Sequence, residues 1–501
     1  DERLREEAKP PSDVNHVQVR QLSRILLLAV ALAVWGPADA VAQPAAGATP
    51  APQEVVPDPA QAELTRARVL VRLGRMQEAL DVFRALLGRS GDRGLREEYA
   101  ETLADSGLLD EAVWEVDDLL AQDPGSVRLR RLRARLDLLR EEPLLAATRL
   151  AALARERPGD AGLSADLAEA ESRSGRWSRA LSLYAGLVER DPDNDALRQA
   201  YREILVARAS RLELSHRTLL QVAATHHTEE VAWKGWLDDR AWLRVGARHA
   251  IYTQDALVGL DGFTEEMQTG LLLVGYQLSP RLEARVGIEE ARREDTLRTT
   301  LRLGGSFDDR RATTASLDLA VREPLTNPVV AIPLRGTTDR LTAQVVRRVA
   351  ERLTLGAQYE RRHYRVSGES LGQAWDLSGR ADAELLRGRL QVTLSPQFFL
   401  SEYSPTVGSP LRERVSFIRR QDVLAVGATV GLDLLPGLRV QLGSAGRRDL
   451  HRTLTSWEVT GDGRWRIHPR VELHVLYTRS TEGGTVGGKE ESIGGVLTFA
   501  H

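Results

Sequence analysis

The chain has 501 residues, a formal net charge of -3 and no cysteine. Its length exceeds that of a usual single domain, so at least two domains are expected. The near-neutral charge excludes the strongly basic surface typical of nucleic-acid binding. The lack of cysteine excludes disulfide bonds and thiolate metal sites.

A stretch near the start of the chain has the pattern of a secretory signal. Arg20 and Arg24 supply a positive region, an apolar run extends from Ile25 to Trp35, and Ala40-Val41-Ala42 forms a small-residue cleavage site. This apolar run is too short to span a bilayer as a helix. The pattern therefore predicts an exported protein, and an uncleaved anchor is the alternative.

Residues 1–42 are accordingly expected to be a signal peptide with an N-terminal extension. Residues 43–60 are rich in proline and alanine and are expected to be a linker. Beyond Gln43 the sequence contains no run of 18 apolar residues, so it predicts no transmembrane helix in the mature chain.

From residue 61 to about residue 192 the sequence repeats with a period of 33 or 34 residues. Two alanines mark each repeat, at Ala67 and Ala79, Ala100 and Ala112, Ala134 and Ala146, and Ala168 and Ala180. Glycine separates the two helices of three repeats, at Gly74, Gly107 and Gly175. The pattern resembles the tetratricopeptide family, in which small residues let paired helices pack closely. The third repeat has Glu141-Glu142-Pro143 instead of the glycine, so we expect distorted helix pairing there.

The resemblance implies a stack of four helix pairs, with a capping helix, over residues 61–210. In this family the first helix of each repeat lines a concave groove. The corresponding charged residues are Glu97, Glu101, Asp105, Arg128, Arg131, Arg135, Glu169 and Arg173. They are either a solvated helical face or a docking groove for a protein partner of complementary charge.

From Arg211 onward, apolar and polar residues alternate with a period of two, which is typical of β-strands. Seven tight turns precede alternating segments, within 237–248, 278–290, 307–319, 349–360, 386–396, 434–444 and 467–475. Their separation leaves room for two strands and a longer loop, as in transmembrane barrels and unlike soluble sandwiches. With both ends of the segment on the turn side, the pattern predicts about 16 strands over residues 211–501. The stretch 323–338 is ambiguous.

The alternation also assigns the two faces of each strand. In the strand after Arg281, Leu282, Val286 and Ile288 share one face, while Glu283 and Arg285 share the other. A densely charged face suits a wet lumen, so the apolar face is expected to contact lipid.

The end of the chain carries a second barrel signal. Ser492, Gly494, Leu497 and Phe499 have a spacing that resembles the C-terminal assembly signal of outer-membrane barrels, although two residues follow the aromatic residue. The predicted fold class is therefore multidomain, with an all-α tetratricopeptide solenoid followed by a transmembrane antiparallel β-barrel of about 16 strands.

No motif indicates catalysis, and no catalytic residue, metal site or cofactor is predicted. The stretch Gly368–Gly372 matches a nucleophile-elbow pattern but is expected in a loop between strands. Residues 483–490 approach a phosphate loop, but Glu490 stands where a hydroxyl residue is needed. The adjacent His226 and His227 are expected to point to opposite faces of a strand, which makes a shared metal ion unfavourable.

An exported helical-repeat region followed by a 16-stranded barrel resembles the outer-membrane exopolysaccharide export porins, in layout closest to the poly-N-acetylglucosamine export porin. This resemblance implies a repeat region in the periplasm that docks a polymer-modifying or synthase-linked partner. It also implies a barrel that contacts outer-membrane lipid and the barrel assembly machinery and conducts a polysaccharide. The lumen candidates chosen by alternation are Arg244, Arg248, Glu283, Arg285, Glu289, Arg298, Arg302, Asp318, Arg322, Asp376, Arg380, Asp382, Glu384, Arg439, Glu472 and His474.

Residues 211–501 contain 39 basic and 36 acidic side chains, a balance that does not name an anionic or a cationic polymer. The charges also fit a structural role, in which they pair across strands and stiffen the wall. Two other functions stay open. One is a non-conducting receptor or assembly platform. The other is a small-solute porin, which an inward-folded loop would favour, with 403–417 as the candidate loop.

Overall fold

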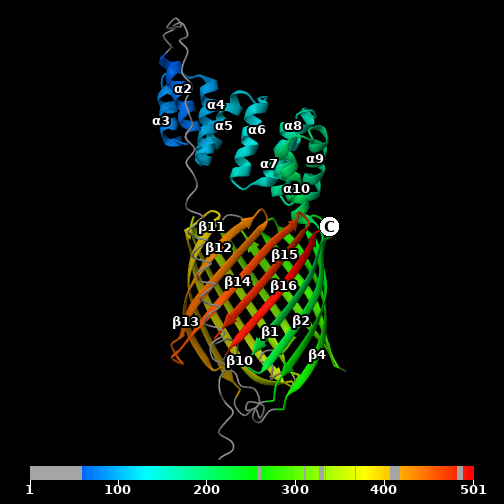
Figure 1. Cartoon of the computed structure of the whole chain (residues 1–501). Helices are drawn as coiled ribbons and strands as arrows, with labels where there is room; N and C mark the ends of the chain where they lie inside the picture. The colour runs from blue at the N-terminus through cyan, green and yellow to red at the C-terminus, as the bar shows by residue number, and fades with distance from the viewer. Residues whose placement is uncertain are drawn as a thin grey trace, which may run out of the picture. The chain divides into compact units, whose positions relative to one another are not determined.

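The computed structural model describes residues 59–500, except 257–260, 295, 310–311, 327–331, 333–334, 367, 407–417 and 482–488. The predicted signal peptide and nearly all of the predicted linker lie outside these residues. The described residues form helices followed by strands (Figure 1). Residues Glu63–His501 belong to one compact unit.

The helices are short, at 12 to 14 residues each. None of them is both long enough and apolar enough to cross a membrane. In the described residues they are α2 (Pro59–Arg72), α3 (Met76–Leu87), α4 (Arg93–Asp105), α5 (Leu109–Gln122), α6 (Val127–Leu139), α7 (Pro143–Glu156), α8 (Ala161–Arg173), α9 (Trp177–Arg190) and α10 (Asp195–Arg208).

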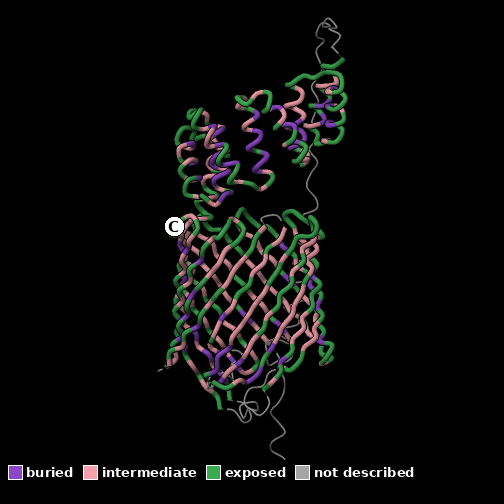
Figure 2. The backbone as a smooth tube through the Cα atoms, turned by 180° about the vertical axis from the view of Figure 1, so that it is seen from behind, coloured by how far each residue is buried: buried purple, intermediate pink, exposed green. Residues whose placement is uncertain are grey.

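The repeat alanines lie where neighbouring helices meet. All eight have no exposed surface. Five of them, Ala100, Ala112, Ala134, Ala146 and Ala168, join leucine-rich clusters that link α3 to α6, α6 to α8 and α8 to α10. Buried positions, drawn in purple in Figure 2, occur along the tubes of the helical region. Small side chains at these positions let the helices approach closely, as the repeat pattern predicts.

A second repeat is formed by the helix N-caps. Asp92, Ser126, Asp160 and Asn194 follow one another at intervals of 34 residues, and the side chain of each accepts a hydrogen bond from the backbone N–H three residues later. Each cap satisfies one backbone donor at the start of α4, α6, α8 or α10. This signal was present in the sequence and reinforces the 34-residue period.

The predicted fold class needs correction. The described residues hold nine short helices followed by a closed 16-stranded antiparallel barrel, and both fall within the unit Glu63–His501. A multidomain chain with an independent solenoid is therefore the wrong description. The strand count agrees with the prediction, and α10 ends at Arg208, three residues before the first strand begins at Arg211.

The expected distortion at the third repeat is also wrong. Glu141 has a φ of 64°, close to the values of 73°, 82° and 87° at the three inter-helix glycines. The next backbone N–H, of Glu142, donates to the carbonyl of Asp137 at 2.8 Å, as Arg75 N–H does to Leu70. The turn is thus preserved, at the cost of placing a side chain in the left-handed region.

We therefore expect Glu141→Gly to stabilise the helical region by up to about 1 kcal/mol, because glycine adopts this φ without steric penalty. The change also removes the ion pair of Glu141 with Arg281, which is partly exposed and offsets some of this gain. The measurement is urea unfolding followed by helical circular dichroism on the whole chain. Gly107→Ala, at the equivalent turn, is the reverse variant and should destabilise by a similar amount. A loss of stability in Glu141→Gly would contradict the prediction.

The strands close into a barrel in which each pairs antiparallel with its chain neighbours, and the first strand pairs with the last. They are β1 (Arg211–Gln221), β2 (Ala224–Trp236), β3 (Ala241–Gln254), β4 (Phe263–Ser279), β5 (Leu282–Arg293), β6 (Thr296–Asp308), β7 (Thr313–Pro324), β8 (Thr337–Ala350), β9 (Leu353–Val366), β10 (Glu369–Leu386), β11 (Leu390–Pro405), β12 (Arg420–Leu435), β13 (Leu438–Asp449), β14 (Leu454–His468), β15 (Val471–Ser480) and β16 (Glu490–Ala500).

The seven predicted turns all lie at the barrel end where β1 begins and β16 ends. The connections at that end have two to four residues, from 237–240 to 469–470. At the opposite end, four connections of 8 to 14 residues, at 255–262, 325–336, 406–419 and 481–489, alternate with four short ones. This long-and-short asymmetry is typical of outer-membrane barrels.

The two faces of the wall differ in chemistry. One face is apolar and exposed, with members such as Leu214, Val245, Leu272, Val286, Leu303, Leu355, Leu394, Val426, Leu442 and Val475. Aromatic residues of the same face lie near the short-turn ends of their strands, at Trp233, Tyr276, Phe307, Trp465 and Phe499. An apolar band with an aromatic girdle is the surface that a barrel presents to lipid.

Candidate functional site

The inner wall of the barrel carries the polar face of the strands. The strand registers place fifteen of the sixteen predicted lumen residues on this face. They are Arg244, Arg248, Glu283, Arg285, Glu289, Arg298, Arg302, Asp318, Asp376, Arg380, Asp382, Glu384, Arg439, Glu472 and His474. In the last strand, Ser492 and Gly494 face inward, and Leu497 and Phe499 face outward, because register partners share a face.

The placement of Arg322 was predicted wrongly. The register between β7 and β8 shifts between Ala320 and Glu323, and Arg322 has a φ of 61°. Such a β-bulge adds one residue and reverses the alternation beyond it. Glu323 therefore takes the inward position and pairs with Arg302 and Arg340, while Arg322 is exposed.

One half of the inner wall carries a chain of alternating charges, which we call the charge ladder. Glu289, with a side chain only 5% exposed, pairs with Arg248 and Arg302 at 2.6 Å each. Arg302 continues to Glu323 at 2.8 Å, and Glu323 to Arg340 at 3.0 Å. Five residues from β3, β5, β6, β7 and β8 thus stiffen the wall beside a cavity of about 410 Å³.

Most of the other lumen candidates also have partners within the wall. Arg244 pairs with Glu213 and Glu230, and Arg285 pairs with Asp318. Further pairs join Arg362 to Asp376, Arg380 to Asp382, Arg439 to Asp433 and His474 to Asp462. Two more contacts are hydrogen bonds, from Trp242 to Glu283 and from Arg298 to the carbonyl of Arg335. This extensive pairing agrees with the structural role considered from the sequence, in which the charges pair across strands and stiffen the wall.

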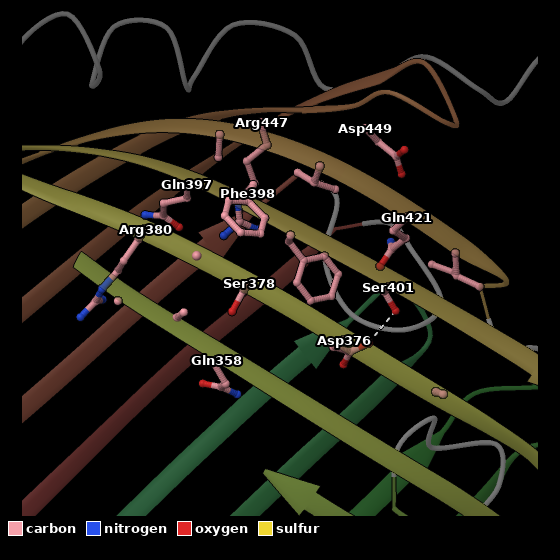
Figure 3. A pocket seen from close by; sticks show the side chains of 18 of the residues that line it. Gln358, Asp376, Ser378, Arg380, Gln397, Phe398, Ser401, Gln421, Arg447 and Asp449 are labelled. Atoms are coloured by element: carbon pink, nitrogen blue, oxygen red, sulfur yellow. Dashed lines mark hydrogen bonds between the residues drawn. The ribbon is translucent and has the colours of Figure 1, made fainter. Parts of the chain in front are cut away.

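The inner wall from β8 to β14 carries neutral polar side chains among paired charges. A cavity of about 620 Å³ is lined by Gln344, Gln358, Ser378, Gln397, Phe399 and Gln421, from β8 to β12 (Figure 3). A smaller cavity of about 280 Å³ continues from it, because Arg380 and Gln397 line both. The same alternation assigns these neutral side chains to the inner face, but the predicted lumen residues include charged side chains only.

Two apolar side chains between β7 and β8 pack on the inner wall. Leu325 is buried against Tyr364, Ala374 and Tyr403, whose positions in the register are inward. Ile332 is buried against a second inner cluster that includes Tyr252 and Met267. The predicted constriction loop was 403–417, of which 407–417 lie outside the described residues. In the described residues, the inward packing between strands is that of Leu325 and Ile332.

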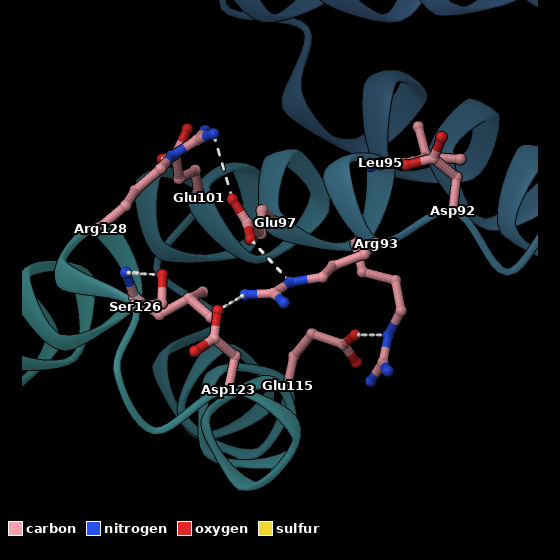
Figure 4. A network of polar contacts seen from close by, with 11 residues as sticks. Asp92, Arg93, Leu95, Glu97, Glu101, Glu115, Asp123, Ser126 and Arg128 are labelled. Carbon is pink, nitrogen blue, oxygen red and sulfur yellow. Dashed lines mark hydrogen bonds and ion pairs between the residues drawn. The ribbon is translucent and has the colours of Figure 1, made fainter.

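The groove candidates in the helical region bind one another. Arg128 pairs with Glu97 at 3.1 Å and with Glu101 at 3.0 Å (Figure 4). Arg135 pairs with Asp105, Arg131 with Asp166, and Arg173 with Glu169. Most of these pairs join the first helices of successive repeats, α4 to α6 and α6 to α8. They act as cross-links between repeats, and such exposed pairs each contribute at most about 1 kcal/mol.

The neighbouring pair in Figure 4 joins Arg93 to Asp123 at 2.7 Å. The hydrogen bond from Arg93 lowers the pKa of the Asp123 carboxyl, so this carboxyl stays ionised.

Two of the rejected motifs fall within the described residues, whereas most of 483–490 lies outside them. Gly368 follows β9, and Glu369–Gly372 belong to the start of β10, so no helix follows the elbow-like pattern. His226 faces inward and stacks on Tyr252 at 4.1 Å, while His227 lies on the outer face. No group of three or more potential metal ligands occurs within the described part of the chain.

No family model and no curated protein matches the chain. Among solved structures, it is similar to a bacterial polysaccharide outer membrane secretin, with 14% identity over 59% of this chain and 99% of that chain, and a TM-score of 0.47. It is also similar to OccAB4 of Acinetobacter baumannii, with 8% identity over 58% of this chain and 97% of that one, and a TM-score of 0.31. MamA of Desulfovibrio magneticus gives 20% identity over 30% of this chain and 87% of that one, and a TM-score of 0.27. At these TM-scores the likenesses carry no argument about function.

Proposed function

We propose that the protein is an outer-membrane channel that exports an exopolysaccharide. The observation that carries this proposal is a closed 16-stranded barrel with an apolar outer face and a polar inner face that lines several cavities. Barrels of 16 to 18 strands are wide enough to leave an aqueous channel. A flexible hydrated polymer needs many weak contacts along a polar wall rather than one tight site.

The helical region would serve this function as a periplasmic docking platform. In outer-membrane barrels the short turns face the periplasm, and β1 begins at the short-turn end, directly after α10. The charged residues of the predicted groove form ion pairs with one another. A partner protein would therefore have to bind over these intact pairs or replace them with pairs of its own.

A small-solute porin is the second candidate. It is favoured by the burial of Leu325 and Ile332 on the inner wall, which brings part of a long connection into the barrel. An inward connection narrows the path that a polymer would take.

Single-channel conductance in planar bilayers tests the two candidates. For an export channel we expect a large conductance that polysaccharides block reversibly, because a polymer in the lumen displaces ions. Conductance that small sugars reduce but polysaccharides leave unchanged would support the porin. A silent barrel would overturn both and favour a receptor or assembly platform.

A further inference from the structure

The inner wall carries polar groups in two states. In the charge ladder, arginine and glutamate side chains satisfy one another across neighbouring strands. In the cavity of about 620 Å³, the side-chain amides of Gln344, Gln358, Gln397 and Gln421 form no hydrogen bond with any other described residue. Each amide therefore keeps two donors and an acceptor available to whatever occupies the lumen.

These amides lie next to one another across the strands. Gln344 is the register partner of Gln358, and Gln358 is that of Ser378, which in turn is opposite Phe399. Gln397 lies on the next inward row of β11, two residues from Phe399. Figure 3 shows Gln358, Ser378, Gln397 and Gln421 around the same cavity. An apolar ring among free amide and hydroxyl groups matches a sugar, which has both C–H faces and hydroxyl groups.

The smaller cavity is lined by small residues, which form a shallow depression in the wall that we call the trough. Gly427, Gly431 and Gly443 lie inward on β12 and β13. A Cβ atom at Gly443 would lie 2.4 Å from the hydroxyl oxygen of Thr460 and 3.2 Å from that of Thr429. Glycine at this position therefore leaves room for both hydroxyl groups at the floor of the trough, where Thr393 and Gln441 add further polar groups.

The charged residues that border these cavities are neutralised by partners. Arg362 pairs with Asp376, and Arg380 with Asp382 at 3.2 Å. Arg447 pairs with Glu458 at 2.5 Å, and Asp449 with Arg452 at 2.6 Å. A polyanion or polycation would have to break these pairs to gain a counter-charge, whereas a neutral polymer binds beside them without that cost.

We infer that this wall, which we call the neutral track, is the path of an uncharged polysaccharide rich in hydroxyl or amide groups. The inference rests on the proposed export function and specifies its cargo. The track comprises the two connected cavities on the inner face of β8 to β14. It discriminates by charge, because its free groups are neutral and its charged groups are paired.

The test is block of single-channel current by oligosaccharides of matched length: neutral dextran, anionic oligogalacturonate and cationic chitosan oligomers. We expect the dextran to block at a concentration at least about tenfold below that of either charged oligomer. In Gln358→Leu/Gln397→Leu, the half-blocking concentration of dextran should rise about tenfold, since two neutral hydrogen bonds are lost. Gln277→Leu, an inward glutamine of β4 outside both cavities, is the matched control and should leave block unchanged.

The empty-channel conductance of each variant shows whether it has folded, and Phe399→Ala serves as a second variant if the double variant does not assemble. Stronger block by a charged oligomer would overturn the inference while leaving export intact. The inference would also be overturned, with export left intact, if dextran blocked the double variant and Phe399→Ala at the same concentration as the wild type. Absence of block by any polysaccharide would instead overturn the proposed function.

Discussion

Replacing Leu394 by arginine is expected to destabilise the barrel by about 2–4 kcal/mol, whereas the same replacement at the adjacent Thr393 should be tolerated. Leu394 is exposed on the apolar face, within an outward run that extends along β11 from Leu390 to Leu400. A guanidinium there would lie within the hydrocarbon region. Thr393 lines the smaller inner cavity, where a new charge remains in water.

The measurement is the yield of folded barrel in lipid vesicles, followed by its heat-modifiable electrophoretic mobility and by denaturant titration. The two variants carry an identical new charge one residue apart, so general effects of arginine cancel. Equal stability of the two variants would refute the assignment of the outer face to lipid.

The second large effect is expected at the centre of the charge ladder. Glu289→Ala should cost about 3–5 kcal/mol, because it leaves Arg248 and Arg302 facing one another without their shared counter-charge. It should also make the channel more selective for anions. Denaturant unfolding measures the first effect, and the reversal potential in a salt gradient measures the second.

Asp318→Asn is the matched variant for this prediction. Its carboxylate lies on the same wall with a single partner, Arg285, and its side chain is 51% exposed. An exposed pair contributes at most about 1 kcal/mol, so this variant should remain nearly as stable as the wild type. Similar losses for Glu289→Ala and Asp318→Asn would show that burial does not determine the strength of these pairs.

The sequence by itself determined the strand count, the faces of the strands and the repeat positions. Each of these properties is local: a strand alternates its side chains, a short turn ends it, and a helix repeat places small residues at fixed intervals. For this reason fifteen of the sixteen lumen candidates lie on the inner face. The turn at Glu141 shows the opposite case, because the fold imposes a glycine-like φ on a glutamate.

Only the tertiary structure decided which polar groups are satisfied. Alternation gives the face of Glu289, but its pairing with Arg248 and Arg302 depends on the register of four consecutive strands. The bulge at Arg322 shifts the register between β7 and β8, so that Glu323 faces inward where alternation predicts Arg322. Sequence periodicity does not reveal this shift. The neutral track arises in the same way, since the pairing of β8 to β12 brings glutamines from separate strands around one cavity. Strand pairing is non-local, and this is why the sequence predicted the wall but not which of its polar groups are paired and which are free.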